Sequence, residues 1–278
     1  MEQKVIFITG TNSGFGKLAL FELAKKGYFV IGTVRDESKK DALLEEARSE
    51  SIDHNIDIFI LDVTNEAQVI SVVQQVISKY ENIDVLIHNA GFSQGGLIEV
   101  TSVDDWVHQF DTNLLGVVRL TKAVLPHMRK RRKGKIINVG SISGRIGLPG
   151  MGPYAASKFA LEGFSESLSL EMAPFHVHVS LIEAGSFKTN IWDKGIQNVK
   201  ATKEKDYEQL METLFVEAKK TSDSAGNPLD VVDVILKICK AKTPKFRYQV
   251  GKGVRFVIFL KAVLPWTWIS KVITSKFK

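Results

Sequence analysis

Short apolar runs alternate with amphipathic helical stretches along most of this chain. The runs that predict β-strands cover residues 5–8, 28–33, 56–61, 85–88, 135–139, 176–182 and 246–250. Helical patterns lie between them, among others over 17–26, 65–80 and 101–129, the last interrupted near Asn113 and Gly116. Strands that alternate with helices form a parallel sheet with crossover helices. The pattern therefore predicts an α/β fold, a single doubly wound domain flanked by helices that binds its ligands at the carboxyl ends of the strands.

A glycine cluster follows the first predicted strand directly. The strand leads into Thr9-Gly10-Thr11-Asn12-Ser13-Gly14-Phe15-Gly16, which opens a helix rich in Leu and Ala. A strand, a glycine turn and a helix N-terminus together present backbone N–H groups and a positive dipole end to a pyrophosphate. The spacing differs from the commonest dinucleotide fingerprint, and Leu18 after Gly16-Lys17 excludes the phosphate loop of NTPases. A turn that only packs the helix on its strand is the alternative; we favour nucleotide binding by a Rossmann-type domain.

Tyr154 and Lys158 form the most informative pair of polar residues. They lie four residues apart in a predicted helix, so they share one face, and Ser141 follows the fifth predicted strand. A phenol ionises near pH ~10 in water, and an adjacent cation lowers that pKa. Such a group can donate and accept a proton in carbonyl reduction or alcohol oxidation. Alone the pair is weak evidence, because tyrosine and lysine occur at this spacing by chance.

The motifs together resemble those of the short-chain dehydrogenases/reductases. The resemblance rests on Thr9-Gly10-x-x-x-Gly14-x-Gly16, Asn89-Ala90-Gly91, Asn113, Ser141 and Tyr154-x-x-x-Lys158, which follow one another at that family's intervals over residues 4 to about 190. The stretch 154–168 is most similar to the hydroxysteroid-dehydrogenase-like and retinol-dehydrogenase-like branch.

The resemblance implies a role for each of four catalytic residues. Tyr154 would transfer the proton and Ser141 would position the substrate oxygen. Lys158 would lower the pKa of Tyr154 and hold the nicotinamide ribose. Asn113 would interrupt a helix so that its backbone carries a water linked to Lys158; without the family context we would interpret it as a solvated helix residue.

The resemblance also implies the residues that contact the cofactor. Asp62-Val63 would meet the adenine, Asn89-Ala90-Gly91 would line the ribose, and Thr189 would meet the nicotinamide carboxamide. The full expected set is Gly10, Ser13, Gly14, Phe15, Gly16, Arg35, Asp62, Val63, Asn89, Ala90, Gly91, Tyr154, Lys158, Gly185 and Thr189. The chain departs from the family pattern at His88, where a second asparagine is usual, and at Ala184, where a proline is usual.

The end of the second predicted strand bears on the choice of cofactor. An acidic side chain there favours NAD, whereas an arginine can grip the 2′-phosphate of NADP. This chain has Val34-Arg35, with no acid before Asp36. We therefore expect NADP(H) rather than NAD(H); an ordinary exposed loop charge at Arg35 is the alternative.

The segment 190–228 occupies the position of the family's substrate lid. Six of its side chains fall on one helical face: Tyr207, Leu210, Met211, Leu214, Phe215 and Ala218. Core packing and the wall of an apolar substrate pocket explain this stripe equally well.

The formal charge of +6 is concentrated in the last residues of the chain. From Gly251 onward there is no acidic residue and there are six basic ones: Lys252, Arg255, Lys261, Lys271, Lys276 and Lys278. Residues 1–250 therefore carry 31 basic and 31 acidic side chains and sum to zero, since the whole chain has 37 and 31.

Apolar side chains of this tail form two helical stripes on either side of Pro265. They are Phe256, Phe259, Leu260, Val263 and Leu264 before the proline, and Trp266, Ile269, Ile273 and Phe277 after it. Lysines interrupt every apolar run well short of the ~18 residues of a spanning helix. Tryptophans beside lysines suit a helix in a membrane interface. A helix over the substrate entrance or at a subunit contact is the alternative, and we favour peripheral membrane contact.

Composition fits one globular enzyme. The 278 residues are 44% hydrophobic and 24% charged, enough for one large core. The single cysteine, Cys239, is expected in that core, and one thiol allows no internal disulfide. A first strand at residue 5 leaves no room for a signal peptide, so we expect a cytoplasmic protein. The basic stretch 129–135 is interpreted as a solvated helix end rather than a nucleic-acid site, and His176 and His178 lack partners for a metal.

These observations predict one catalytic domain over 1–250, with a lid over about 190–228, and an amphipathic extension over 251–278. The expected activity is NADP(H)-dependent interconversion of a carbonyl and an alcohol on an apolar, steroid-, retinoid- or lipid-like substrate. We also expect a homo-oligomer, a dimer or tetramer. A non-catalytic nucleotide-binding regulator or membrane scaffold of the same fold is the alternative, and intact Ser141, Tyr154 and Lys158 argue against it.

Overall fold

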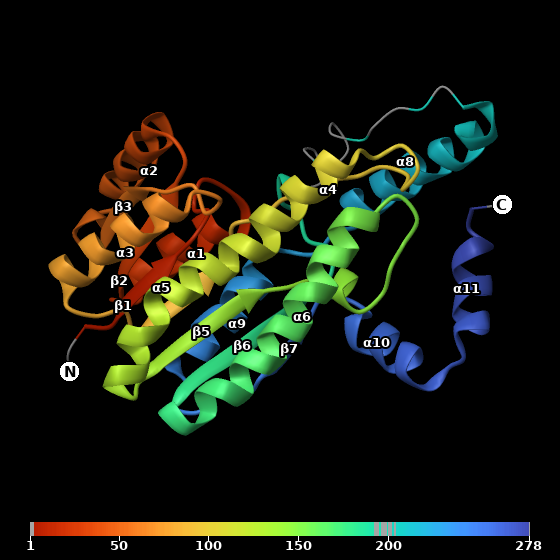
Figure 1. The fold of residues 1–278 in the computed structure, drawn as a ribbon. Helices are drawn as coiled ribbons and strands as arrows, with labels where there is room; N and C mark the ends of the chain where they lie inside the picture. Colours follow the sequence, from red (N-terminus) through yellow and green to blue (C-terminus); the bar gives the residue numbers. More distant parts are fainter. Residues whose placement is uncertain (1–2, 192–194, 196–198, 200–201, 203, 278) are drawn as a thin grey trace.

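A seven-stranded parallel sheet forms the centre of the protein (Figure 1). The computed structural model describes residues 3–191, 195, 199, 202 and 204–277. The strands lie in the order β3-β2-β1-β4-β5-β6-β7. Their bounds are β1 Val5–Ile8, β2 Phe29–Val34, β3 Ile56–Ile60, β4 Val85–His88, β5 Gly134–Val139, β6 Val177–Ala184 and β7 Arg247–Val250. The predicted doubly wound architecture is confirmed.

Helices cover both faces of the sheet. Their bounds are α1 Gly14–Lys25, α2 Glu37–Ser49, α3 Glu66–Tyr80, α4 Val103–Phe110, α5 Gly116–Arg131, α6 Gly152–Met172, α8 Glu208–Asp223, α9 Leu229–Lys240, α10 Val254–Val263 and α11 Trp266–Thr274. One core lies between the sheet and α1, α2 and α9, and a second lies between the sheet and α3, α5 and α6. Alternate strand residues serve the two cores: Ile6 and Ile8 belong to the first, Val5 and Phe7 to the second.

Side-chain caps begin three of these helices. Asp36 accepts a hydrogen bond from the Lys39 amide at 3.1 Å, at the start of α2. Asn65 caps α3 in the same way, and Ser102 caps α4. Each cap satisfies one of the amides that the first helical turn leaves without a partner. The predicted helix over 65–80 therefore begins one residue later, with Asn65 as its cap.

The predicted interruption near Asn113 is a single turn of π-helix. It covers Asp111–Leu115, between α4 and α5. One extra residue in the turn shifts the register of the helix, so the Asn113 side chain is directed inward and is buried.

Strand ends differ from the prediction by one or two residues. The sixth strand was expected over 176–182 and runs over Val177–Ala184, because His176 has a positive φ of 55° and cannot continue an extended chain. The longer strand carries Glu183 into the sheet, where it is fully buried.

The C-terminal extension is a pair of short helices, and Pro265 separates them as predicted. In Figure 1, α10 and α11 extend beyond the sheet, at the end of the molecule where α8 also lies. Leu260, Leu264, Ile269 and Ile273 are only partly exposed. The most exposed apolar side chains of α11 are Trp266, Trp268 and Val272, so of the predicted second stripe Trp266 is exposed, whereas Ile269, Ile273 and Phe277 are partly covered.

Candidate active site

Two neighbouring elements bring Ser141, Tyr154 and Lys158 together at the carboxyl end of β5. Ser141 caps the short 3₁₀ turn that follows this strand, accepting a hydrogen bond from the Ser143 amide at 3.1 Å. Tyr154 and Lys158 lie in the first turns of α6, whose start is favoured by Pro153. The Ser141 side chain lies close enough to the Tyr154 phenol to lower its pKa. All three residues are less than a tenth exposed, so the chemistry they support is shielded from bulk water.

The Lys158 ammonium is held beneath the tyrosine. Its Nζ donates to the carbonyl oxygen of Val139 at 2.9 Å and lies 5.8 Å from the centre of the Tyr154 ring. Burial lowers the pKa of Lys158 to about 8. The lysine therefore remains largely charged at neutral pH, although an ammonium in water would be far harder to deprotonate.

In the protein without a bound cofactor, the prediction that Lys158 lowers the pKa of Tyr154 is wrong. Burial raises the pKa of the Tyr154 phenol, and the nearby Ser141 side chain offsets only part of that rise. A phenolate is poorly solvated in a closed site, and at 5.8 Å from the ring the ammonium is too distant to reverse the effect. Tyr154 is thus held in its protonated form, which is the form that donates a proton.

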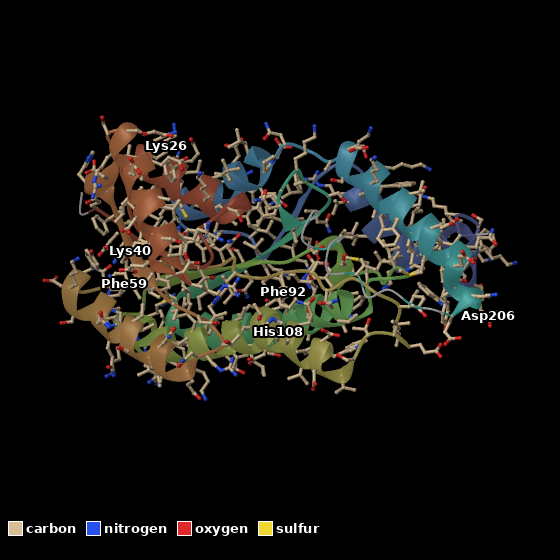
Figure 2. The ribbon with its side chains drawn as sticks, turned by 90° about the horizontal axis from the view of Figure 1, so that it is seen from above. Lys26, Lys40, Phe59, Phe92, His108 and Asp206 are labelled. Carbon is tan, nitrogen blue, oxygen red and sulfur yellow. The ribbon has the colours of Figure 1, made fainter. Side chains whose placement is uncertain are left out.

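Asn113 joins three elements around this centre. Its Oδ1 accepts from the Phe92 amide at 3.1 Å, and its Nδ2 donates to the Phe92 carbonyl at 3.0 Å and to Ser157 Oγ at 3.2 Å. Phe92 follows the Asn89-Ala90-Gly91 segment and stacks at 4.8 Å on His108, in the middle of the molecule (Figure 2). The asparagine side chain thereby fixes the predicted ribose segment against the catalytic helix.

Ser157 was not among the expected site residues, yet it completes this link. Its hydroxyl donates to the carbonyl oxygen of Tyr154 at 2.8 Å and accepts from Asn113. It is fully buried, and its position three residues after the tyrosine places it on the inner side of α6. Burial of a small polar residue beside the pair cannot be inferred from one sequence, which is why it was missed.

The glycine loop is held tightly against the end of β4. Gly10 has a φ of 71°, and a Cβ there would lie 2.9 Å from the Cα of Ala90. At Gly16 a Cβ would lie 2.2 Å from the carbonyl oxygen of Gly10, so only glycine allows α1 to approach the turn this closely. Asn89 Nδ2 donates to the carbonyl oxygens of Thr9 and Gly10, each at 2.9 Å. Thr9 Oγ1 in turn accepts from the Asn89 amide, a second contact missed from the sequence.

The start of α1 fits a nucleotide pyrophosphate. Its N-cap, Ser13, makes no side-chain capping bond, and no acidic residue lies in the first turn. The helix therefore directs its amides and positive dipole end outward from the loop. A Cβ on Gly14 would lie 3.5 Å from Thr189, so the residue predicted for the nicotinamide end lies beside the same loop. Gly185 and Phe15 flank this region: Gly185 packs on Val254, and the rings of Phe15 and Phe187 are 5.7 Å apart.

An exposed arginine, Arg35, follows β2, and the nearest acidic residue, Asp36, is hydrogen-bonded within the start of α2. Val34 is buried and Arg35 is exposed. The Asp36 carboxylate accepts from Ser38 Oγ at 2.8 Å and from the Lys39 amide, and the hydrogen bond with Ser38 is the main cause of its lowered pKa. Asp36 is therefore committed to capping α2.

Asp62 and Val63 form the turn after β3. Asp62 Oδ1 accepts from the amide and the hydroxyl of Thr64, at 2.9 and 2.8 Å. Val63 is buried against Gly116. A Cβ added to Gly116 would lie 2.7 Å from Val63 Cγ2. This close packing sets α5 beside the predicted adenine contact.

His88, where the family has an asparagine, is accommodated by a hydrogen bond. Its Nε2 lies 2.9 Å from Thr121 Oγ1 on α5. Complete burial lowers the pKa of His88 to about 3, so the ring is neutral and takes no part in proton transfer at physiological pH.

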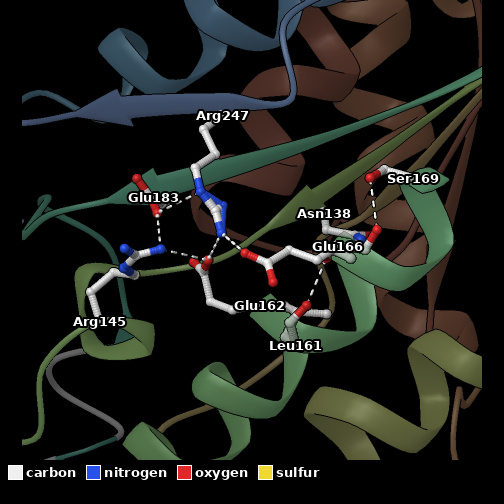
Figure 3. A network of polar contacts seen from close by, with 9 residues as sticks. Asn138, Arg145, Leu161, Glu162, Glu166, Ser169, Glu183 and Arg247 are labelled. Carbon is white, nitrogen blue, oxygen red and sulfur yellow. Dashed lines mark hydrogen bonds and ion pairs between the residues drawn. The ribbon is translucent and has the colours of Figure 1, made fainter.

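Five charged side chains from α6, β6, β7 and the turn after β5 form a cluster (Figure 3). Its members are Arg145, Glu162, Glu166, Glu183 and Arg247. Arg247 Nη2 contacts Glu162 at 2.9 Å and Glu166 at 2.5 Å, and its Nε lies 3.7 Å from Glu183. Arg145 Nη1 lies 3.4 Å from Glu162 and 3.5 Å from the fully buried Glu183. Burial, and then repulsion from Glu183, raise the pKa of Glu162 to about 7.

Other predicted features occupy structural positions. Cys239 is buried, and burial raises the pKa of its thiol to about 12. In the basic stretch, Arg131 pairs with Asp84 at 3.2 Å and Lys135 Nζ donates to the last carbonyls of α9. Among the residues described, His, Cys, Asp and Glu form no group able to hold a metal ion. None of the helices described is long and apolar enough to cross a membrane.

The lid stripe is mixed in character. Met211 is buried, while Phe215 is 41% exposed. Leu214 packs against Gly150 in the loop that precedes α6. Tyr207 donates its hydroxyl to Glu99 at 2.5 Å. Parts of the predicted lid over 190–228 lie outside the described residues. The described side chains of the stripe include both buried and exposed ones, so they do not decide between core packing and a pocket wall.

Comparison with known proteins agrees with this geometry. A relative from Bacillus subtilis (strain 168), named "Uncharacterized oxidoreductase YusZ", is 39% identical and covers 99% of both chains. The 3-ketodihydrosphingosine reductase of Bacteroides thetaiotaomicron is 40% identical over 94% of this chain and 93% of its own. Retinol dehydrogenase 8 of Homo sapiens is 36% identical over 88% of this chain and 81% of its own.

Solved structures and a family model extend the comparison. ElxO with NADP bound shares 27% identity with this chain at a TM-score of 0.77, covering 92% of this chain and 100% of its own. The model of the family described as short chain dehydrogenase matches residues 4–200. The chain therefore belongs to the short-chain dehydrogenases, and it is an NAD(P)-dependent oxidoreductase of that family.

Proposed function

We propose that this enzyme interconverts a carbonyl and an alcohol on an apolar, steroid-, retinoid- or lipid-like substrate, with NADP(H) as its cofactor. The observation that carries the proposal is the burial of Ser141, Tyr154 and Lys158 together at the carboxyl end of β5, with Lys158 one helical turn after Tyr154 along α6. The bound nicotinamide supplies the hydride that adds to the carbonyl carbon.

The side chains of this chain handle the proton and the developing charge. In reduction, the Tyr154 hydroxyl donates its proton to the oxygen that becomes the alcohol, and it takes that proton back in oxidation. Ser141 donates a hydrogen bond to the same oxygen and so fixes its position. The Lys158 ammonium stabilises the phenolate that remains. Because burial raises the pKa of Tyr154, the resting phenol is protonated, and this favours the reductive direction.

Cofactor preference rests on the end of β2. Arg35 is exposed there, whereas the nearest carboxylate, Asp36, is engaged with Ser38 and Lys39. A guanidinium can bind a 2′-phosphate through two hydrogen bonds, and Asp36 Oδ1 is engaged by Ser38 and the Lys39 amide at the start of α2. We propose that Gly10, Gly14, Gly16, Asp62 and Asn89 hold the rest of the nucleotide, together with the other residues named from the sequence.

The substrate class is inferred from the surroundings of the site and from its relatives. Leu214 and the loop at Gly150 pack together beside α6, and Leu148 in that loop is 45% exposed. The molecules in the names of two relatives, 3-ketodihydrosphingosine and retinol, both carry long apolar chains.

The remaining proposals concern the organisation and the location of the protein. We propose residues 1–250 as the catalytic domain and 251–278 as an extension that meets a membrane peripherally. We also propose a homo-oligomeric state and a cytoplasmic location.

A cofactor-oxidation assay tests this function. Purified full-length protein is mixed with NADPH, or with NADH, and with apolar ketones, aldehydes and quinones, including a long-chain 3-ketosphingoid base, retinal and a ketosteroid. We expect oxidation of NADPH with at least one apolar substrate, faster than with NADH, and at least about 100-fold slower with Tyr154→Phe. Bound NADPH is measured in parallel by its fluorescence. Binding without turnover on every substrate would instead favour the non-catalytic nucleotide-binding protein.

A further inference from the structure

Each of the two C-terminal helices exposes large apolar side chains. More than half of the surface of each such side chain is accessible to solvent: Phe256, Phe259, Val263, Trp266, Trp268 and Val272. On α10, the three members lie at spacings of three and four residues and share one face. Trp268 and Val272 share a face of α11 in the same way. Clustered apolar side chains of this size mark an interaction surface.

The same surface is cationic. Lys252, Arg255, Lys271 and Lys276 are exposed around these apolar residues. No acidic residue occurs between Gly251 and the last residue, and the formal charge of +6 equals that of this segment. Two copies of the surface facing each other would bring these cations together with no carboxylate from either tail. Charge therefore disfavours a second copy of this chain and favours an anionic partner.

The tail is connected to the surroundings of the catalytic site. Lys261 donates a hydrogen bond to the carbonyl oxygen of Arg145 and lies 4.8 Å over the ring of Phe159. A cavity of about 300 Å³ lies between α10 and α6, so this face of α10 does not pack closely on α6.

The lid helix lies at the same end of the molecule. The pKa of Glu217 on α8 is lowered mainly by its hydrogen bond from Lys220 and least by the charge of Lys276, which follows α11. Exposed Phe215 and Val216 precede Glu217. Figure 2 shows Asp206, just before α8, at the opposite end from Lys26 and Lys40.

We propose that α10 and α11 dock this protein onto the surface of an anionic lipid bilayer, with the tryptophans in the interface and the lysines on the headgroups. Helices of this length and charge lie in the interfacial plane. Docking there brings the loop at Leu148 and helix α8 to the bilayer. In the part of the inference that rests on the proposed function, an apolar substrate passes directly between lipid and site.

Vesicle sedimentation of the full chain tests this inference without reference to activity. Vesicles of phosphatidylcholine alone are compared with vesicles containing phosphatidylglycerol, at low and at ~1 M salt, where the Debye length falls to ~3 Å. We expect binding to the anionic vesicles only, lost at high salt, with a blue shift of tryptophan fluorescence.

Paired variants separate charge from apolar contact. Each basic side chain near an anionic surface contributes about fivefold to binding, so Lys271→Gln/Lys276→Gln should weaken it about 25-fold. Trp266→Ala/Trp268→Ala should weaken it at least about tenfold. The matched control, Lys26→Gln/Lys40→Gln, removes the same charge at the opposite end and should leave binding unchanged.

Three outcomes would overturn the inference. They are equal binding to neutral and anionic vesicles, equal weakening by the control pair, and the absence of vesicle binding together with self-association that the tryptophan variants abolish. NADPH oxidation with the same panel of apolar ketones, aldehydes and quinones is followed in every variant. Activity without vesicle binding refutes the docking alone, and vesicle binding without activity refutes the proposed function alone.

Discussion

Glu162 makes the stability of this enzyme depend on pH near neutrality. Its carboxylate is 9% exposed, faces Arg145, Glu183, Glu166 and Arg247, and borders the cavity that Lys261 lines. The cluster holds three carboxylates and two guanidiniums, so one carboxylate is in excess when all are charged. Protonation of Glu162 removes this excess. We predict that Glu162→Gln flattens the dependence of the unfolding free energy on pH.

The magnitude follows from the pKa of Glu162, which is about 7 in the folded protein against 4.5 for an unperturbed group. The difference of about 2.5 units corresponds to roughly 3 kcal/mol at 1.36 kcal/mol per unit, as an upper limit. Because the folded pKa is raised, this contribution is fully present below pH 4.5 and is lost as pH rises through 7. The wild type should therefore lose up to about 3 kcal/mol over this window relative to the glutamine variant.

Urea unfolding at several pH values between 5 and 8 measures this difference. Glu166→Gln is the matched control, since Glu166 also pairs with Arg247 but its side chain is 58% exposed to water. That variant should change stability by less than about 1 kcal/mol at every pH. A difference between wild type and Glu162→Gln that stays constant with pH, or that changes in the opposite direction, would refute the reasoning.

Three further predictions concern the site itself. Tyr154→Phe should lower kcat about 10²- to 10⁴-fold while NADPH binding, followed by fluorescence titration, is retained, because only the proton donor is lost. Arg35→Ala should raise the KM for NADPH by about 10- to 100-fold and leave the KM for NADH unchanged, since a charge-assisted hydrogen bond contributes about 1.5–3 kcal/mol; equal effects on both cofactors would contradict this assignment. Ser157→Ala should cost about 1–3 kcal/mol in urea unfolding, because it leaves buried Asn113 Nδ2 with one partner fewer; Ser157→Thr, which keeps the hydroxyl, is its control.

Local patterns in the sequence were sufficient for the elements of the sheet. Val85–His88 was predicted residue for residue, because three apolar residues and His88 between polar turns leave little choice. An interruption of the helix near Asn113 and Gly116 was also predicted, but not that it is a turn of π-helix. Strand ends such as Ala184 depend on pairing with β7, which lies more than sixty residues further along the chain.

The charged cluster of Figure 3 could not be predicted in this way. Arg145, Glu162, Glu183 and Arg247 come from four separate elements, and each alone is typical of a solvated surface position. The pKa of Tyr154 was mispredicted for a related reason. Sequence spacing placed a cation beside the phenol, but the sign of the shift depends on how deeply both groups are buried.

Helix α6 connects proton transfer to the more distant parts of the molecule. Tyr154, Lys158 and Glu162 are four residues apart and share one side of this helix, and Arg145 follows Ser141 at the same interval. The loop that positions Ser141 is thus held by the Arg145–Glu162 pair and by Lys261 of α10. A shift of α10 on a lipid surface would act first on the Arg145 carbonyl, four residues from the catalytic serine. The tail and the charged cluster therefore contact the same loop, so pH and the proposed docking of α10 should affect activity through one structural element.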